Sequence, residues 1–230
     1  MQIQGLQKLT LLDFPGQTAC TVFTAGCNFR CPFCHNASLV THVDAAPVCT
    51  EEEFFSFIDK RKGLLDGVAV TGGEPLLQKD IVPFLEKLRS YGMRIKLDTN
   101  GSRPAVLREI VQKGLVDYVA MDVKNTAEKY ALTAGIAAQD LAAVGESIDF
   151  LLTDAVDYEF RTTLVRDFHT EADIAALAER LCGAKRWFLQ NFVDSGDLID
   201  GSCQGFSTQE MRKMLDVARL KAPFAELRGI

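Results

Sequence analysis

The chain has 230 residues, of which 47% are hydrophobic and 24% charged, as is ordinary for a globular protein with a packed core. Its formal net charge of −6 and pI near 5.2, with no basic run, argue against nucleic acid as a partner. No apolar run reaches the roughly 18 residues of a membrane span. The start MQIQGLQKLT lacks the charged and apolar regions of an export signal, so we expect a cytoplasmic protein that does not bind membranes.

Short runs rich in β-branched or aromatic residues predict six strands, at residues 19–24, 67–71, 94–99, 118–123, 158–165 and 186–192. Helical patterns lie between and after them, and four of these carry start signals at Thr50 with Glu53, Ser102 with Pro104, Thr170, and Ser207 with Glu210. Strands that alternate with helices of ten or more residues predict right-handed crossovers and a parallel sheet. With no repeat and no long linker, we expect one α/β domain over residues 1–230.

Three of the seven cysteines stand close together in the stretch TAGCNFRCPFCHN, at Cys27, Cys31 and Cys34. An odd number of cysteines in a chain without an export signal argues against a disulfide framework. Thiolates bind both zinc and iron–sulfur clusters, and these sites usually take four protein ligands. Three thiolates can hold three irons of a four-iron cluster and leave the fourth iron open to another ligand.

The alternative for these cysteines is a structural zinc site, which Cys20, Cys49 or His35 would complete. Zinc sites usually have two separated pairs of ligands, and this disfavours the alternative. Cys20 alternates with apolar residues and Cys182 ends a helical pattern, so we interpret both as small buried hydrophobic residues. The sequence assigns no role to Cys49 or Cys203.

Polar segments follow the predicted strands at their carboxyl ends. After the cysteine loop they are TGGEP at 71–75, DTNG at 98–101, MDVK at 121–124, RTT at 161–163 and QNF at 190–192. In a barrel or curved sheet of parallel strands, such segments all meet over one mouth. The sequence therefore predicts a single site.

Two of these segments offer groups for a polar ligand. Gly72 and Gly73 allow a backbone to approach a ligand closely, Pro75 fixes the chain after Glu74, and this edge could bind an α-ammonium group; a plain turn is the alternative. Asp98, Thr99 and Asn100 carry the donors and acceptors that a ribose or an amino-acid head group needs, and an Asx-turn closing the strand is the alternative.

Asp122 and Lys124 are two residues apart on a predicted strand and so share one face, where a ligand or a structural ion pair would compensate their charges. Arg161 and Thr163 share a face in the same way, and the guanidinium could receive a carboxylate. Phe33, between Pro32 and Cys34, could provide an aromatic surface for a base, with simple core packing as the alternative. The sequence leaves the identity of any catalytic residue unknown.

Together, sites for a cluster, an ammonium, a ribose, a carboxylate and a base describe S-adenosylmethionine, chelated to the open iron through its amino and carboxylate groups. The spacing Cys-x3-Cys-x2-Cys in CNFRCPFC, with the later TGGEP, resembles the signature of the radical S-adenosylmethionine (radical SAM) superfamily. From about Leu6 to Phe206 the chain also resembles the activating proteins of anaerobic ribonucleoside-triphosphate reductase, through KLTLLDFPGQTACTVFTAGCNFRCPFCHN, TGGEPLL, DTNG, MDVK and FRTTLV.

This resemblance implies a partial (β/α)6 barrel and a [4Fe–4S] cluster that receives an electron from a flavodoxin-like or ferredoxin-like donor. Reductive cleavage of S-adenosylmethionine then gives methionine and a 5′-deoxyadenosyl radical, which abstracts a hydrogen atom from a glycine of the reductase. The implied protein is thus an oxidoreductase that activates a glycyl-radical enzyme.

Three alternatives remain at this point. The segments CHN, DTNG and MDVK are also similar to activases of pyruvate formate-lyase. A radical enzyme could instead act on a small molecule, although we find no insert that would serve as a lid over the mouth, and an open mouth favours a protein loop as substrate. A zinc or electron-transfer module is the non-enzymatic alternative. His169, just before a helix, could reach the site or simply flank that helix.

Overall fold

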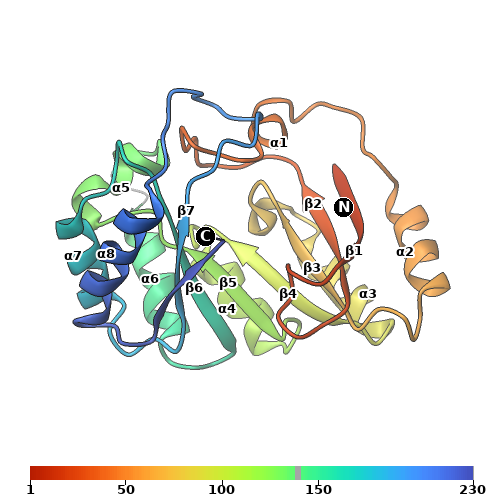
Figure 1. Cartoon of the computed structure of the whole chain (residues 1–230). Coiled ribbons are helices and arrows are strands. Elements are labelled where there is room, and N and C mark those ends of the chain that lie inside the picture. Colours follow the sequence, from red (N-terminus) through yellow and green to blue (C-terminus); the bar gives the residue numbers. More distant parts are fainter. Residues whose placement is uncertain (138–140, 230) are drawn as a thin grey trace.

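The computed structural model describes residues 1–137 and 141–229 (Figure 1). Within these residues the strands are β1 (Gly5–Thr10), β2 (Ala19–Thr24), β3 (Gly67–Gly72), β4 (Arg94–Thr99), β5 (Tyr118–Asp122), β6 (Asp157–Leu164), β7 (Trp187–Asn191) and β8 (Ala225–Arg228). The helices are α1 (Ala37–Thr41), α2 (Glu51–Lys60), the 3₁₀ turn η1 (Pro75–Leu77), α3 (Ile81–Ser90), α4 (Pro104–Gln112), α5 (Ala127–Ala134), α6 (Leu141–Leu151), α7 (Glu171–Arg180) and α8 (Thr208–Arg219).

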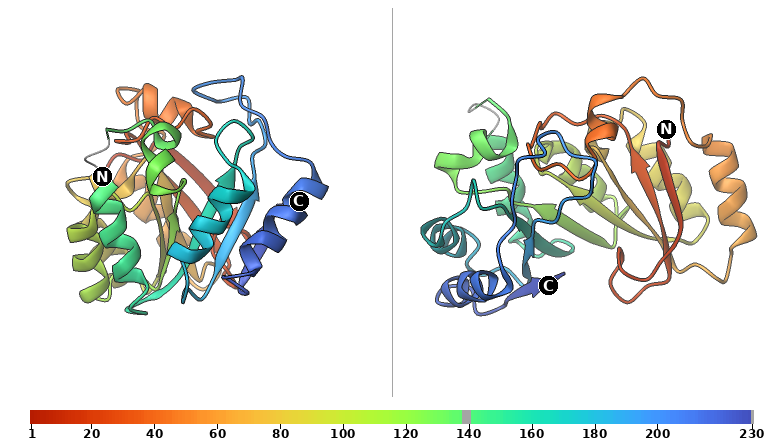
Figure 2. Two further views of the ribbon diagram at one scale, coloured as in Figure 1. Left: turned by 90° about the vertical axis from the view of Figure 1, so that its left-hand side faces the viewer. Right: turned by 45° about the horizontal axis from the view of Figure 1, so that its top comes forward.

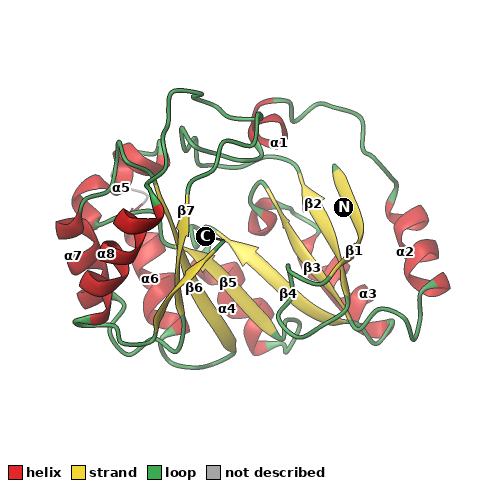
Figure 3. Cartoon of the chain, viewed as in Figure 1, coloured by secondary structure: helices red, strands yellow, loops and turns green. Residues whose placement is uncertain are grey.

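The eight strands form one sheet in sequence order, from β1 at one edge to β8 at the other. The pairs from β2 to β8 are all parallel, and β1 pairs antiparallel with β2. The sheet is curved, with the helices on its outside (Figures 2 and 3). The expected partial barrel of parallel strands is confirmed, and the six predicted strands correspond to β2–β7 with ends that agree within one residue.

Two edge strands, β1 and β8, were not expected from the sequence. The segment GLQKLT of β1 is partly exposed, and its pairing with β2 shifts register between Gln7 and Thr10. The four residues AELR of β8 pair with β7. Both segments lack the long apolar or alternating pattern of a strand, because an edge strand is buried on only part of its surface.

Three of the four predicted helix starts are confirmed by capping boxes, in which Thr50, Thr170 and Ser207 each accept a hydrogen bond from the backbone three residues later. The fourth was wrong in detail, because α4 begins with Arg103 as its N-cap and Pro104 in the first turn. The Ser102 hydroxyl instead donates to Asn28 Oδ1 at 3.2 Å.

The main hydrophobic core lies between the sheet and the helices and includes side chains from β2 through β8. Cys20 is fully buried in it, as expected. The expectation for Cys182 was wrong: α7 ends at Arg180, Leu181 takes the buried position, and Cys182 is exposed. Among the described residues, no helix combines the length and apolar character that a membrane crossing requires.

Candidate active site

A pocket with a volume of about 400 Å³ lies at the carboxyl ends of the parallel strands. It draws on every polar segment that the sequence predicted to converge, through Cys27, Cys31, Cys34, Thr71, Gly72, Gly73, Asp98, Thr99, Asn100, Asp122, Lys124, Arg161, Thr163 and Gln190. The structure therefore gathers most of the predicted site residues around one cavity, as expected for a parallel sheet of this kind.

The cysteine loop, residues 25–36, forms one wall of this pocket. It is held by neighbouring backbone, because Gly26 N donates to Leu39 O at 2.8 Å and Arg30 N to Ala134 O at 2.9 Å. Burial raises the pKa of Cys27 and raises that of Cys31 to about 12. Cys31 is buried and Cys27 is partly buried, so both thiols need a positive partner to ionise, and soft thiolates on one pocket wall fit an iron–sulfur cluster.

The candidates for a fourth protein ligand differ in position. Cys20 is buried in the core of β2, and Cys49 pairs by a single β-bridge with Ile3. His35 does line the pocket, where its ring stacks on Phe192 with centroids 5.5 Å apart. The zinc alternative therefore retains only His35 among the three candidates that we weighed.

Gly72 and Gly73 line the pocket, but the structure gives a different reason for glycine than close approach of a ligand. A Cβ on Gly72 would lie 2.3 Å from Thr24 N, and one on Gly73 would lie 2.0 Å from Gly26 O. Gly73 N also donates to Thr24 O at 2.8 Å. The two glycines thus allow the chain after β3 to pack directly against the start of the cysteine loop.

Glu74 and Pro75 are buried, and neither lines the pocket. The Glu74 carboxylate accepts hydrogen bonds from Thr99 Oγ1 at 2.8 Å, Asn100 N at 2.7 Å and Leu76 N at 3.1 Å. Its position thus differs from that expected of a ligand contact. The side chain joins the turn after β3 to the turn after β4.

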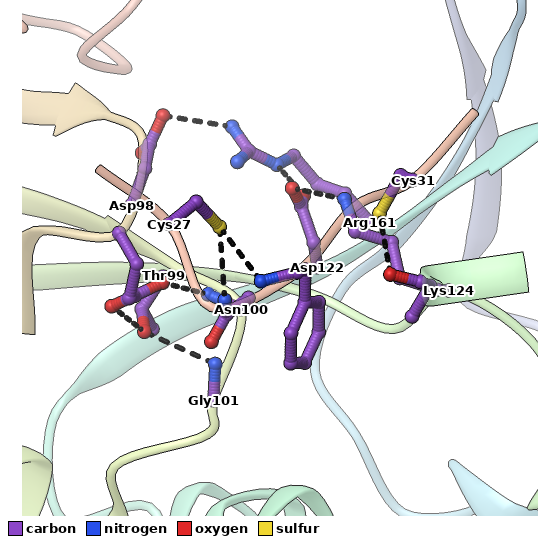
Figure 4. Close-up of polar contacts among 12 residues, drawn as sticks. Cys27, Cys31, Asp98, Thr99, Asn100, Gly101, Asp122, Lys124 and Arg161 are labelled. Carbon is purple, nitrogen blue, oxygen red and sulfur yellow. Dashed lines mark hydrogen bonds and ion pairs between the residues drawn. The ribbon is translucent and has the colours of Figure 1, made fainter. Parts of the chain in front are cut away.

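Four charged residues, Asp98, Asp122, Lys124 and Arg161, form what we call the pocket network (Figure 4). Arg161 Nε donates to Asp122 Oδ1 at 2.8 Å, and its Nη1 to Asp98 Oδ2 at 3.2 Å. Lys124 Nζ donates to Asp122 Oδ2 at 2.9 Å, and Lys96 Nζ contacts Asp98. The structural ion pair considered for Asp122 and Lys124 is therefore present.

These contacts keep the pocket network ionised. Burial alone would raise the pKa of Asp122, but Arg161 and Lys124 hold it well below its usual range. Burial alone would likewise lower the pKa of Lys124, and Asp122 raises it instead. A ligand in the pocket would meet fixed positive and negative charges at neutral pH.

The remaining predicted residues also lie at the pocket. Thr99 and Asn100 are nearly buried, and Asn100 Oδ1 accepts from Ser102 N at 2.9 Å, which is the expected Asx-turn. Thr163 contributes to the lining. Phe33 lines the pocket too, and its ring packs on Phe168 with centroids 5.9 Å apart, so it combines core packing with a pocket-facing surface.

Sequence reasoning missed several features of the site. Asp13 and Thr21 line the pocket and are joined by a hydrogen bond of 2.5 Å from Thr21 Oγ1 to Asp13 Oδ2. The alternation of side chains along β2 turns Thr21 and Phe23 inward, so it could have identified Thr21 as a site residue. No sequence pattern marks Asp13. His169 is buried and lies outside the lining; its Nε2 lies 2.8 Å from Lys124 O.

The segment 193–206, which follows β7, lies beside the cysteine loop and α1 at the top of Figure 1. Asp200 N donates to Pro32 O at 2.8 Å, and the Asp197 carboxylate accepts from both N and Oγ of Ser38. We had expected no covering element at this end. The segment packs against the outside of the cysteine loop, while the pocket lining comes from other parts of the chain.

Comparison with known proteins agrees with this geometry. The family model of the Radical SAM superfamily matches residues 21–151, more than half of the chain. This chain belongs to the radical SAM superfamily. It is therefore an enzyme that uses a [4Fe–4S] cluster and S-adenosylmethionine.

Individual relatives differ in their named activities. The chain is 31% identical to a protein of Methanocaldococcus jannaschii named as a glycyl-radical enzyme activating enzyme, over 83% of this chain and 79% of that protein. It is 29% identical to the 7-carboxy-7-deazaguanine synthase of Koribacter versatilis, over 72% of this chain and 70% of the synthase. The solved structure of SuiB from Streptococcus suis has the same fold, with a TM-score of 0.70 at 11% identity, over 91% of this chain and 48% of SuiB.

Proposed function

We propose that this enzyme activates a glycyl-radical enzyme, and that its target is anaerobic ribonucleoside-triphosphate reductase. The observation that carries the proposal is the resemblance to such activating proteins along most of the chain, from the cysteine loop to the segments that line the pocket. The similarity to the Methanocaldococcus jannaschii protein supports the activase class. All strands from β1 to β8 belong to one sheet, and this supports the proposal that residues 1–230 act as one domain.

In this proposal Cys27, Cys31 and Cys34 hold the cluster. When bound there and reduced by a flavodoxin-like or ferredoxin-like donor, the cluster would supply the electron for cleavage of S-adenosylmethionine to methionine and a 5′-deoxyadenosyl radical, and this radical would take a hydrogen atom from the target glycine. Lys124 and Arg161 orient the carboxylate and polar groups of S-adenosylmethionine, and Phe33 packs against its base. The contacts of Lys124 and Arg161 with Asp122 keep these two donors in place before the ligand binds.

The proposed cluster ligands have a direct test by substitution. Cys27→Ala, Cys31→Ala or Cys34→Ala should each abolish cluster binding and cleavage of S-adenosylmethionine. The matched controls are Cys20→Ala and Cys182→Ala, one buried and one exposed, which should keep the cluster. Iron and sulfide analysis after anaerobic reconstitution is the measurement. If Cys20→Ala remains folded but loses the cluster, or if zinc binds stoichiometrically in place of iron, the open-iron assignment fails.

The target is tested by electron paramagnetic resonance on the reduced enzyme mixed with S-adenosylmethionine and the reductase of the same cell. A doublet from the remaining Cα hydrogen of a C-terminal glycine should appear on the reductase, and it should collapse to a singlet when that Cα carries deuterium. A parallel reaction contains pyruvate formate-lyase. A doublet on the lyase alone would overturn the choice of partner while preserving the activase class.

A radical enzyme acting on a small molecule is the second candidate, and the similarity to 7-carboxy-7-deazaguanine synthase favours it. Its signature is accumulation of 5′-deoxyadenosine in the presence of a small substrate, with no radical on either glycyl-radical enzyme. The same spectra and a chromatographic assay for 5′-deoxyadenosine therefore separate the two candidates.

A further inference from the structure

The sulfur of Cys27 accepts hydrogen bonds from two N–H donors, whereas the sulfur of Cys31 faces a carbonyl oxygen. Phe29 N donates to Cys27 Sγ at 3.3 Å, and Asn100 Nδ2 lies 3.6 Å from the same atom (Figure 4). Cys31 Sγ lies 3.7 Å from Ala134 O. The Phe29 donor is backbone, so the Asn100 amide is the contact that a substitution can remove.

The orientation of the Asn100 amide is determined by its neighbours. Its Oδ1 accepts from Ser102 N at 2.9 Å, so the other end of the amide must be the NH₂ group. That group faces Cys27 Sγ and Asn28 Oδ1, the latter at 3.1 Å. A donor is therefore aimed at the sulfur by protein contacts alone.

The backbone of Asn100 is held equally firmly. Asn100 N donates to Glu74 Oε2 at 2.7 Å, and Thr99 Oγ1 donates to Glu74 Oε1 at 2.8 Å. Glu74 is completely buried and does not line the pocket. Its carboxylate thus positions the turn that carries Asn100. This role explains why the Glu74 side chain is buried away from the pocket, which a ligand contact does not.

An N–H group that points at a cluster thiolate stabilises negative charge on the sulfur. A cluster becomes more negative when it is reduced, so such a donor stabilises the reduced form more than the oxidised form and raises the reduction potential. Charge-assisted hydrogen bonds of this kind are stronger than neutral ones. Removing the donor should therefore make the cluster harder to reduce.

We propose that Asn100 is a hydrogen-bond donor to Cys27 that raises the reduction potential of the cluster, and that Glu74 is the positioning residue that holds Asn100 in place. The inference rests on the proposed binding of the cluster by Cys27. It differs from the role expected from the sequence, in which Asn100 contacts the ribose or head group of S-adenosylmethionine. The two roles separate when the potential is measured without S-adenosylmethionine.

The test compares Asn100→Asp, Asn100→Ala and the control Ser102→Ala in anaerobically reconstituted protein. Asn100→Asp keeps the acceptor for Ser102 N but places a carboxylate beside the sulfur, and Asn100→Ala removes the amide. Ser102→Ala removes a hydroxyl bound to the same Asn28 oxygen without touching Cys27. The midpoint potential is measured by redox titration followed by electron paramagnetic resonance, with iron, sulfide and circular dichroism checked for each variant.

Relative to the native protein, we expect a more negative potential in both Asn100 variants, with the larger shift in Asn100→Asp and the smaller in Asn100→Ala. The potential of Ser102→Ala should equal that of the native protein. Glu74→Gln should shift the potential in the same direction by a smaller amount. One oxygen of the carboxylate is replaced by an NH₂ group, which cannot accept from the N–H and O–H groups that face it, so Asn100 is held less firmly. Unchanged potentials in both Asn100 variants, with weaker binding of S-adenosylmethionine, would overturn the proposal in favour of a ligand contact. Loss of the cluster from both variants, with the fold intact, would overturn it in favour of a role in assembly.

This experiment needs neither the reductase nor any other target. A shifted potential in an enzyme that fails to activate the reductase would leave the inference standing and reject the proposed target alone. Retention of the cluster in the Cys27→Ala variant would instead remove the premise of the inference and reject it.

Discussion

Two groups of charged side chains lie at different heights in the same barrel. Their comparison shows that position along a strand decides whether such a group lines the binding pocket or only stabilises the fold. The pocket network uses Asp122 at the end of β5 and Arg161 on β6. A second group, which we call the sealed network, uses Tyr118 at the start of β5 and Glu159 on β6, with Arg186 and Arg228. On each strand the two groups share a face, because the residues are an even number apart.

The sealed network is complete in itself. Arg228 Nη1 and Nη2 donate to the two Glu159 oxygens at 2.6 and 2.8 Å, and Tyr118 OH donates to Oε2 at 2.7 Å. Phe14 and Ala120 pack with Tyr118 in a small apolar cluster. The Glu159 side chain is 1% exposed, against 29% for Asp122 in the pocket network, whereas the Arg228 and Arg186 side chains of the sealed network are 36% and 35% exposed. Similar chemistry thus fills the barrel at one end and lines a cavity at the other.

The largest expected effect is on stability and comes from the sealed network. Arg228→Met leaves the buried Glu159 carboxylate without its bidentate cation. Because the Arg228 side chain is itself 36% exposed, the loss should be about 3 kcal/mol, the lower end of what breaking a fully buried pair costs. Denaturant unfolding of the apoprotein should show this loss. Affinity for S-adenosylmethionine in the reconstituted protein should not change.

The double variant Glu159→Leu/Arg228→Met is the matched control for that prediction. It removes both charges, so it should recover most of the stability that Arg228→Met loses. If the single variant binds S-adenosylmethionine more weakly at unchanged stability, the sealed network belongs to the binding site and the comparison fails.

Glu74 is a third kind of buried carboxyl, since it accepts hydrogen bonds but forms no ion pair with any residue that the structure describes. Burial raises its pKa from 4.5 to about 7, whereas Arg228 keeps the pKa of Glu159 below its usual value despite burial. A raised native pKa means that the folded protein holds the proton more tightly than the unfolded chain. The contribution of Glu74 to the free energy of unfolding should be fully present below about pH 4.5. It should be lost as the pH rises through 7, by about 3 kcal/mol in total.

Comparison with Glu74→Gln isolates this pH dependence, because the amide does not titrate and the other groups cancel in the difference. The stability of the native apoprotein relative to the variant should fall between pH 4.5 and pH 8. A difference that stays flat over this range would mean that the three hydrogen bonds offset burial and that the Glu74 pKa is not raised.

In the pocket network the expected effect is on ligand affinity. Lys124→Met leaves Asp122 paired with Arg161 but removes a charged donor from the pocket. S-adenosylmethionine should bind about ten- to a hundredfold more weakly, which corresponds to about 1.5 to 3 kcal/mol for a charge-assisted contact. Calorimetry on reconstituted protein measures this. The matched control is Lys129→Met, which removes a lysine of α5 paired with Asp173 at 2.6 Å, outside the pocket.

Equal affinities for S-adenosylmethionine in Lys124→Met, Lys129→Met and the native enzyme would make the pocket network purely structural. It would then differ from the sealed network only in exposure, and the distinction drawn from depth along the strands would be lost.

The pocket end of the fold could be predicted from the sequence because its signals are local. Strands β2–β7 carry runs of β-branched and aromatic residues, and each polar segment directly follows its strand. The convergence of Asp98, Asp122 and Arg161 then follows from the parallel order of the strands. Local pattern and topology together are sufficient for these positions.

The sealed network could not be predicted, because its partners are far apart and one of them lies on an unpredicted strand. Glu159 meets Arg228 only through β8, and AELR has no strand pattern of its own. The orientation of Glu74 was hidden for the same reason: two of the three groups that it accepts from, Thr99 Oγ1 and Asn100 N, lie 25 and 26 residues later. Gly72 and Gly73 were expected to let the backbone approach a ligand, whereas the close approach that the structure shows is to the backbone of Thr24 and Gly26.

The smallest expected effect concerns the outside of the pocket end, where segment 193–206 contacts α1, the helix that directly follows the cysteine loop. Asp197 accepts from Ser38 N at 3.1 Å and from Ser38 Oγ at 2.7 Å, in the manner of a cap on the first turn of α1. Asp197→Ala should cost about 0.5 to 2 kcal/mol locally, with little change in global unfolding. Because α1 and the cysteine loop joined to it then open more often, the cluster should be lost faster to an iron chelator.

Asp194→Ala is the matched control for Asp197→Ala, since the Asp194 carboxylate accepts from Gly196 N within the same segment, whereas the Asp197 carboxylate accepts from Ser38 of α1. Release of iron, followed by absorbance under anaerobic conditions, should be faster in Asp197→Ala than in Asp194→Ala or the native enzyme. Equal rates in all three would show that the backbone contacts, such as Asp200 N to Pro32 O, are sufficient to hold the loop. Faster loss in Asp197→Ala alone would place the stability of the pocket end in a contact from outside the barrel, in contrast to the sealed network, in which the Glu159 contacts join β5, β6 and β8.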